Sequence, residues 1–387
     1  MLLRVLGHIT AIILTGCAIG DGQTASEPFR REVRLGRDAY DAMRHLRLRP
    51  IQEVRWSWEK PRRRTDDIQA AIAGRNGALF IAAKGEVIRQ FNARGEYVRT
   101  IGGLGVDSGE YQSADAVGYD GGSRIHIFDA STLQLLTYDT SGQYIRTTRV
   151  AVTPDYVGAR GAPDGLITLS ISPGEHYGDS VKGRLFAVST RPHTKTRTIV
   201  VRAGAVRVED GDLQPMRPFF MPRPVWNVGY DGSIVYAAGG DEYITRYDSA
   251  GQPDVLIQLA VPPVPVSPAD IEREMARVLH QFSDSWHARA RPYIERAANE
   301  SPRTQPLFTD IVALNDSSLW IRESPITVAD SVRWDAIAFD GRPLGFTMMP
   351  VTSHIMSGSM QHLLVVEVGR DGAPHAVWYT ADTEEAP

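Results

Sequence analysis

A short phrase that recurs along the chain constrains its fold more than any other feature. Each copy has an apolar run ending in an aromatic residue and Asp or Asn, then a glycine three residues later, then another apolar run. Asp, Asn and Gly favour tight turns, and the flanking runs are rich in β-branched and aromatic residues. Each copy therefore predicts two strands joined by a turn. The clearest copies are Phe91-Asn92 with Gly95, Tyr138-Asp139 with Gly142, and Tyr247-Asp248 with Gly251.

The spacing of the repeat predicts a β-propeller. Small or polar residues open strand-like runs at Gly77, Gly122, Gly165, Gly232, Ser318 and Gln361, and three of the five intervals are 43–45 residues. A period of about 40–45 residues is typical of one four-stranded propeller blade. We explain the two longer intervals by insertions at residues 204–224 and 263–306. In the second blade we expect strands at residues 115–119, 124–128, 134–138 and 144–150.

The last of the six predicted blades lacks one strand. Only residues 352–356, 362–368 and 375–379 are strand-like there, before an acidic end of the chain. An open blade would leave a strand edge exposed to aggregation. The alternating run Gln52–Trp58 is available, and we expect it to close the ring beside His375–Tyr379. The predicted fold is an all-β, six-bladed propeller of four-stranded antiparallel blades, with an N-terminal strand completing the last blade and one inserted helical segment.

The start of the chain predicts export. A mostly apolar run from Val5 to Leu14 is too short to span a bilayer, and small residues follow it. The run ends in Leu14-Thr15-Gly16-Cys17, and Cys17 is the only cysteine. This ending resembles the bacterial lipobox, in which the cysteine becomes the first mature residue and carries lipid. The resemblance, with Ala18 after the cysteine, implies an anchor in the outer membrane, facing the periplasm or the cell surface.

The region after the cysteine is unlike the rest of the chain. Residues 18–28 are small and polar and predict a flexible tether. From Arg30 to Arg64 there are twelve basic and five acidic residues, whereas the whole chain carries a net charge of −4. This basic stem is either a solvated linker or a surface that lies against anionic headgroups. A short helix is expected over Arg37–Leu48, with Tyr40, Met43 and Leu46 on one side.

The junction between the first two blades carries a resemblance to a known repeat. Thr100–Tyr111 is rich in glycine and ends in Gly109-Glu110-Tyr111, and it leads through residues 116–120 into Arg124–Asp129. This segment resembles the NHL-type repeat, and the chain from about residue 50 to 380 is similar to bacterial six-bladed propeller lipoproteins of that kind. The match is degenerate elsewhere, since Ala114 stands where the repeat usually has Pro.

The two insertions are the places where we expect a partner to bind. Ser267-Pro268-Ala269-Asp270 predicts a helix start, and apolar residues at helical spacing follow as far as Trp286. Pro292 is expected to break or kink this helix, with residues 293–298 continuing it. The helix is either a hairpin packed on one propeller face or a partner-binding element. The earlier insertion is rich in proline, and its apolar residues either pack beneath the loop or face a partner. The predicted partner-binding residues are Phe219, Phe220, Met221 and Trp286.

The sequence offers little for catalysis. The ten histidines are scattered, with none of the usual zinc, nucleophile-elbow or phosphate-loop patterns. The acidic propeller region does not favour nucleic acid. Some six-bladed propellers are lactonase-like hydrolases whose channel residues hold a divalent cation. Asp115, Asn227 and Asp310 open innermost strands and are the corresponding calcium candidates, although polar residues there also suit a solvated channel.

These observations divide the chain and leave three functions open. The predicted parts are a signal peptide (1–17), a tether and basic stem (18–49), the propeller (50–381) and a tail (382–387). We expect a monomeric binding platform in the cell envelope, without a cofactor, held by its lipid anchor and binding an unknown protein, glycan or small molecule. The alternatives are a metal-dependent lactonase-like hydrolase and a structural envelope protein.

Lipid attachment at Cys17 is directly testable. Because the acyl chains would be the membrane anchor, Cys17→Ser is expected to move the protein from the membrane fraction to the soluble fraction, measured by fractionation of cells expressing the full chain. Persistent membrane attachment of the variant would contradict the lipobox prediction.

Overall fold

The protein is described by a computed structural model. It describes residues 29–54, 68–73, 78–83, 85–119, 124–149, 156–162, 165–177, 180–189, 197–203, 218–229, 231–240, 242–260, 262–280, 282–314, 317–324, 330–369 and 372–383; residues 156–203 are described by their backbone alone. The predicted signal peptide, the lipobox, residues 55–67 and residues 204–217 of the proline-rich insertion lie outside these ranges.

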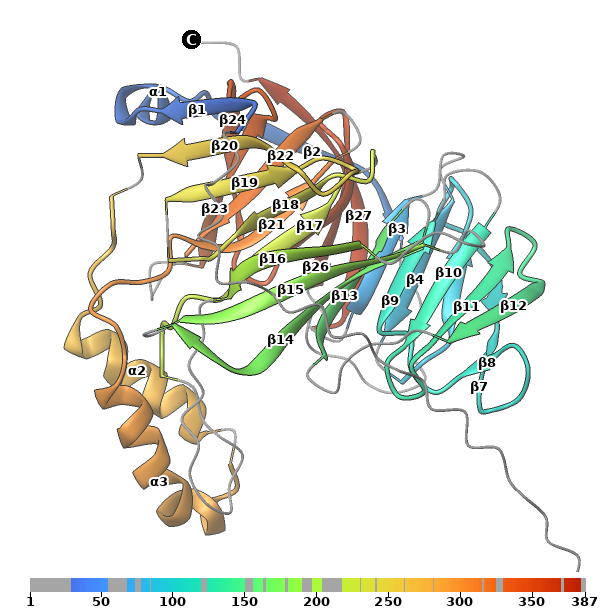
Figure 1. Cartoon of the computed structure of the whole chain (residues 1–387), viewed down its shortest axis with the longest axis horizontal. Coiled ribbons are helices and arrows are strands. Elements are labelled where there is room, and N and C mark those ends of the chain that lie inside the picture. The colour runs from blue at the N-terminus through green and yellow to red at the C-terminus, as the bar shows by residue number, and fades with distance from the viewer. Residues whose placement is uncertain are drawn as a thin grey trace, which may run out of the picture.

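Most of the described chain forms antiparallel sheets in which sequence neighbours pair (Figure 1). Five sheets have four strands: β3–β6, β9–β12, β13–β16, β21–β24, and β2 with β25–β27. A further sheet contains β17–β20 and a fifth strand, β1. The innermost strands contact one another in the cyclic order β3, β9, β13, β17, β21, β25 and back to β3. The fold is an all-β propeller with four-stranded antiparallel blades.

The strands lie close to their predicted positions. In the second blade, for example, the predicted 124–128 and 134–138 each extend by one residue. The bounds are β1 Arg31–Leu35, β2 Leu46–Val54, β3 Ile68–Ala73, β4 Leu79–Ala83, β5 Ile88–Phe91, β6 Tyr97–Ile101, β7 Gly103–Leu104, β8 Glu110–Tyr111, β9 Ala116–Tyr119, β10 Arg124–Asp129, β11 Gln134–Asp139, β12 Tyr144–Arg149, β13 Tyr156–Ala162, β14 Gly165–Tyr177, β15 Ser180–Ser189, β16 Arg197–Ala203, β17 Val225–Val228, β18 Ile234–Ala237, β19 Tyr243–Tyr247, β20 Pro253–Leu259, β21 Phe308–Ala313, β22 Ser318–Glu323, β23 Ser331–Ala338, β24 Pro343–Pro350, β25 His354–Ser359, β26 His362–Val368 and β27 Pro374–Thr383.

The repeated phrase forms the same turn in three sheets, between the third and fourth strands. Asp139 accepts hydrogen bonds from the backbone N–H groups of Ser141 (2.9 Å) and Gln143 (2.8 Å). Gly142 adopts φ +82°, which favours glycine because a side chain there would be strained. Asn92 and Asp248 accept the same pair of bonds in their own turns. The phrase is therefore a turn-capping motif that fixes the hairpin register.

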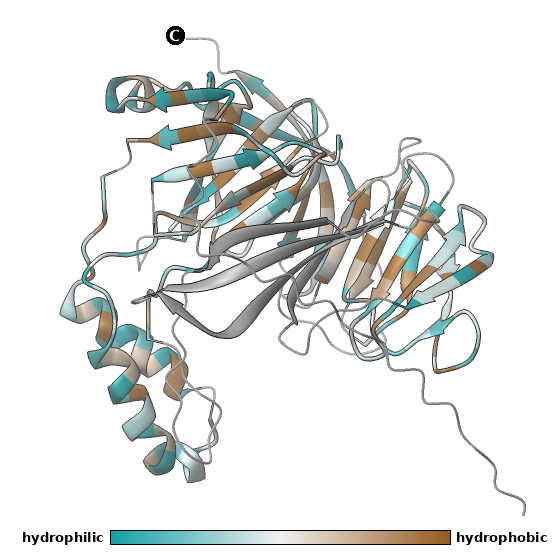
Figure 2. Cartoon of the chain, in the orientation of Figure 1, coloured by the Kyte–Doolittle hydropathy of each residue, from teal (hydrophilic) through white to brown (hydrophobic). Residues whose placement is uncertain are grey.

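The core lies between neighbouring blades. All residues of β4 and β18 are buried, and so are most of β10, β22 and β26. These second strands are covered on both faces, which explains why their sequences are continuous apolar runs and do not alternate. Figure 2 shows hydrophobic residues along the middle of the described sheets.

The predicted closure is present. β2 pairs antiparallel with β27, with Gln52 opposite Trp378 and Val54 opposite Ala376. The strand occupies residues 46–54, so it begins earlier than the predicted run 52–58. Leu46 and Leu48 face the core while Arg47 is exposed, so this alternation belongs to a strand. The helix predicted over Arg37–Leu48 was wrong beyond its first turn: α1 spans only Arg37–Asp41.

Polar contacts reinforce this closure. His375 on β27 lies between two acidic residues of its neighbouring strands, with Nε2 3.1 Å from Glu53 Oε1 on β2 and 3.5 Å from Glu367 Oε1 on β26. The hydrogen bond to Glu367 raises the pKa of His375, against the opposing effect of burial, and Glu53 raises it further. The protonated imidazole therefore links the two ends of the chain to the same sheet.

A second correction concerns the basic stem. We call Arg31–His45 the strap. Its strand β1 pairs in parallel with β20, from Arg31 opposite Val255 to Leu35 opposite Leu259. The strap then crosses β24, where the backbone N–H of Phe346 donates to Arg44 O (2.9 Å), before the chain enters β2. Both predicted alternatives, a solvated linker and a surface against anionic headgroups, rest on the arginines of the stem. Val33 and Leu35 instead alternate inward and pack on the core, so this part is not a solvated linker.

The inserted helix is a helical pair. α2 spans Pro268–Leu279 and α3 spans Asp284–Asn299. The helix is therefore interrupted between Leu279 and Asp284 and not at Pro292, which lies inside α3. The predicted start is present: the Ser267 hydroxyl accepts from Asp270 N, and the Asp270 carboxylate accepts from Ser267 N. None of the described helices is long and apolar enough to cross a membrane.

The closing strand is expected to be essential for stability. Leu46 is 1% exposed in the core between the last two sheets, so Leu46→Ala should lower the free energy of unfolding by about 2–5 kcal/mol through the cavity it leaves. Arg47→Ala, at the exposed neighbouring position, should change it by less than about 0.5 kcal/mol. Urea denaturation measures both, and equal effects of the two variants would contradict an integral role for β2.

Candidate functional site

Three regions of the described chain could carry function. They are polar residues on the innermost strands, the helical pair with residues 218–221, and an apolar surface on the first two blades. The first two contain the residues predicted from the sequence, and the third was not predicted.

The innermost strands place the three calcium candidates in different blades. Asp115 lies directly before β9, and its Oδ2 accepts from Ala130 N (2.8 Å). Asn227 Oδ1 on β17 accepts from Val228 N (2.9 Å), and Asp310 Oδ1 on β21 accepts from Ile311 N (2.9 Å). Each side chain therefore already accepts a hydrogen bond within its own blade. The registers also differ: Asp310 lies opposite Arg322 near the end of β22, whereas Asn227 lies opposite Val235 near the start of β18.

One ionisable pair does join two innermost strands. His354 Nδ1 on β25 lies 3.9 Å from Asp310 Oδ2, and both side chains are about a quarter exposed. Behind them, the Arg322 guanidinium donates to Thr309 Oγ1 (3.4 Å) and Val351 O (2.5 Å), which ties β22 to both neighbouring segments. The described residues contain no group of three or more His, Cys, Asp or Glu placed to hold a metal ion. Calcium binding at Asp115, Asn227 and Asp310 stays a prediction.

The helical pair encloses the aromatic residues of the earlier insertion. Phe219 is 6% exposed and packs with Ala290, Ile294 and Ala297 of α3. Phe220 is only partly buried against the same cluster, and Met221 is also half-buried. The apolar side chains of α2, from Ile271 to Leu279, pack there as well. Phe219 therefore holds the insertion to the helices, which is the packed alternative for this loop.

Trp286 stands apart from that cluster. It is 43% exposed, and the Arg289 guanidinium lies 5.1 Å from its ring centroid. Because α2 ends at Leu279 and Trp286 lies on the separate helix α3, Trp286 does not continue the apolar stripe of α2. Figure 1 shows the helical pair to one side of the sheets. An exposed tryptophan on a projecting element suits partner contact.

The apolar surface lies on the outer strands of the first two blades. Ten large hydrophobic side chains of the described chain are exposed, and six belong to β6, β12 and the loop from β6 to β8. We call these six the rim patch. They are Tyr97 (56% exposed), Val98 (38%), Leu104 (44%), Val106 (78%), Tyr144 (38%) and Ile145 (45%).

The segments that carry the rim patch adjoin one another. A Cβ at Gly109, in the loop, would lie 3.1 Å from the Tyr144 side chain on β12. The Arg99 guanidinium on β6 donates to Ser141 O in the turn before β12. Tyr111 anchors the loop: its fully buried hydroxyl donates to Ile101 O (2.9 Å) and accepts from Ile88 N (2.8 Å), and burial raises the pKa of Tyr111 to about 12. The patch is thus displayed by an ordered junction.

A clear sequence signal for the rim patch existed. Leu104 and Val106 are large apolar residues in a glycine-rich loop. They do not recur at helical or strand spacing, so the sequence gives no reason to expect that they are buried. The pairs Tyr97-Val98 and Tyr144-Ile145 each place apolar residues on both faces of an outer strand.

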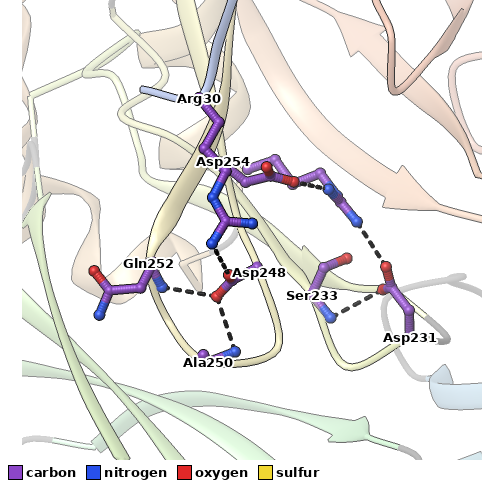
Figure 3. A network of polar contacts seen from close by, with 8 residues as sticks. Arg30, Asp231, Ser233, Asp248, Ala250, Gln252 and Asp254 are labelled. Atoms are coloured by element: carbon purple, nitrogen blue, oxygen red, sulfur yellow. Dashed lines mark hydrogen bonds and ion pairs between the residues drawn. The ribbon is translucent and has the colours of Figure 1, made fainter. Parts of the chain in front are cut away.

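The turns at the edge of the sheet of β17–β20 are polar by contrast (Figure 3). Arg30 Nη2 lies 3.7 Å from Asp248 Oδ2, at the turn between β19 and β20. Arg246 donates to Asp254 and, at 2.6 Å, to Asp231 in the turn before β18. Hydrogen bonds from Ser233 and the charge of Arg246 lower the pKa of Asp231, against the effect of its burial. This network fixes the turns to which Arg30, the residue before the strap, attaches. Each carboxylate drawn in Figure 3 has a partner.

Comparisons with known proteins add little beyond this geometry. No family model and no curated protein matches the chain. Solved structures that resemble it include a protein of Bacteroides fragilis NCTC 9343 described as exported (11% identity, 92% of this chain and 99% of that one, TM-score 0.45). Others are the RRP9 WD40 repeats (14%, 87% and 97%, TM-score 0.47) and a DUF4221 family member from Bacteroides vulgatus (11%, 89% and 100%, TM-score 0.43).

Calcium is expected to leave the stability of the protein unchanged, because the three candidates lie in different blades and one side-chain oxygen of each already accepts a backbone hydrogen bond. The measurement is the melting temperature of the chelator-treated protein during calcium titration, with Asp310→Asn as the comparison. A rise in melting temperature that Asp310→Asn abolishes would contradict this expectation and favour the hydrolase alternative.

Proposed function

We propose that this protein is an exported, lipid-anchored, six-bladed β-propeller that binds a partner protein in the bacterial cell envelope and catalyses no reaction. The ring is a rigid support, and its perimeter displays the contacts. The signal-like start and the lipobox-like Cys17 support export and anchoring, and Ala18 favours the outer membrane.

The rim patch is the observation that carries the binding role. Exposed apolar side chains gathered on adjoining segments are typical of protein interaction sites. Tyrosine and aliphatic residues beside arginine are also the composition enriched at protein interfaces, and Arg99 lies among them on β6. A glycan or small-molecule ligand would more often require a concave site with convergent polar groups.

The strands that carry the patch suggest how a partner binds. β6 and β12 end their sheets, so their outer backbone edges have no partner strand among the described residues. The same chain fills the comparable edge of another sheet with its own strand, because β1 adds beside the fourth strand β20. An extended segment with alternating apolar side chains could add to β6 or β12 in the same way.

Site-specific photocrosslinking tests this proposal in the full-length, lipidated protein. A photoreactive residue replacing Val106 should give a protein adduct in intact cells, whereas the same residue at Glu295, on the exposed side of α3, should give none. With the identified partner purified, replacing Tyr144 and Ile145 by serine should weaken binding at least tenfold, because each truncation of an interface anchor costs more than about 1 kcal/mol.

The controls separate a binding defect from a folding defect. The serine variant should keep the melting temperature of the wild type, since both side chains are exposed. Loss of binding in Trp286→Ala with an unaffected serine variant would assign the partner to the helical pair instead. Absence of an adduct at Val106 would contradict the rim patch as the binding surface.

A further inference from the structure

A cluster of buried and half-buried ionisable groups holds the strap to the sheet of β21–β24. Tyr40 of α1 is 5% exposed, and its hydroxyl contacts both Glu323 Oε1 on β22 and Asp335 Oδ2 (2.5 Å) on β23. Arg333 on β23 donates to Asp335 Oδ1 (2.7 Å) and lies 3.7 Å from Glu323 Oε1. We call these four residues the tyrosine cluster.

Proton counting shows what this geometry requires. A phenol has one proton, so Tyr40 can donate to only one of the two carboxylates that its oxygen contacts. The second contact is a hydrogen bond only if a carboxyl group donates to the phenol oxygen. Burial raises the pKa of Asp335 as well, but Arg333 contacts Asp335 more closely than Glu323, and its charge opposes that rise. Glu323 is therefore the group that holds the extra proton.

The surroundings agree with this assignment. Burial, and then the charge of Asp335, raises the pKa of Glu323 to about 7, although Tyr40 and Arg333 oppose the shift. Apolar contacts seal the cluster: the Arg333 guanidinium lies over the rings of Tyr40 (4.6 Å) and Phe346 (4.1 Å), and its Nη2 is 3.6 Å from Met43 Sδ. With both carboxylates ionised, one guanidinium would face two buried negative charges.

Few other charges face the cluster. On the strap, the side chains of Arg37, Asp38, Asp41 and Arg44 are exposed, and Arg37 pairs with Asp41 at 3.5 Å. On β24, Phe346 contacts His45 edge-on, with ring centroids 5.3 Å apart. A histidine also changes charge near neutral pH, so His45 is the competing source of any pH response in the strap.

We propose that the tyrosine cluster is a proton-operated latch that docks the strap onto the propeller in acid and loosens it as the pH rises toward neutrality. Docking binds a proton at Glu323, so the latch is fully engaged below the ordinary glutamate value of 4.5 and weakens up to about pH 7. Within that window the docking equilibrium falls by about tenfold per pH unit.

Release of the strap would increase the distance that the propeller can move from the lipid anchor. The strap lies between Cys17 and β2, and its fifteen residues would extend about 50 Å when undocked. This consequence rests on the proposed lipid anchor, whereas the pH response of the strap does not.

Hydrogen exchange of the full-length protein tests the latch. After correction for intrinsic exchange rates, protection of residues 31–45 should fall at least tenfold from pH 5.5 to pH 8, while that of α2 and α3 stays constant. Glu323→Gln, which keeps a proton donor at every pH, should retain protection at pH 8. Glu295→Gln on α3 and His45→Gln should behave like the wild type.

The outcomes separate this proposal from the others. Constant protection of the wild-type strap across this range would overturn the latch, even if Glu323→Gln failed to fold. A pH response that survives Glu323→Gln and disappears in His45→Gln would move the switch to the histidine. Neither result bears on lipidation or on the rim patch, which the fractionation and crosslinking experiments measure.

Discussion

The pairing of β2 with β27 is the contact on which the rest of the structure depends. Sheets arranged in a ring bury their faces against neighbours, so the first and last sheets are stable only when they meet. The C-terminal run supplies three strands, and an N-terminal strand provides the fourth. Three kinds of contact stabilise this pairing: the backbone hydrogen bonds of the ladder, the burial of Leu46, and the contacts of His375 with Glu53 and Glu367. The first and last sheets are thereby held together, and the strap that precedes β2 attaches to the outside of the ring.

That constraint separates scaffold from candidate function. The middle strands of the blades are buried on both faces and leave little surface for a ligand. The perimeter differs from blade to blade. The strand β1 of the strap lies beside β20, and the helical pair extends from one side (Figure 1). The rim patch lies on β6, β12 and the loop between β6 and β8. Interruptions of the repeat were the expected functional places, yet Phe219 is used there to pack the insertion onto α3. Among the side chains that the structure describes, the largest group of exposed apolar residues lies instead within the first two blades.

Local signals predicted the elements that local physics controls. The turn containing Asp139 and Gly142 was predictable because its hydrogen bonds and positive φ involve residues within five positions of each other. The capping box at Ser267 was predictable for the same reason. The break between α2 and α3 was not, because Pro292 was taken as the interruption while the chain instead folds back before Ser283 to bring Phe282 toward α3. The strap was missed because its arginines obscured two inward residues, Val33 and Leu35, whose partners lie more than two hundred residues away.

The sequence by itself determined the period, the turns and the strand that closes the ring, since repetition, capping residues and a missing fourth strand are all visible in one dimension. Tertiary structure alone decided which charged groups are buried together. Tyr40 lies nearly three hundred residues before Glu323 and Asp335, and nothing in its local sequence marks it as their neighbour. They share a proton because the strap crosses the sheet of β21–β24 before the chain enters β2, which pairs with β27 in the next sheet. A buried carboxylate pair is unfavourable in isolation, and only the ring geometry that places Tyr40 and Arg333 beside it makes the arrangement stable.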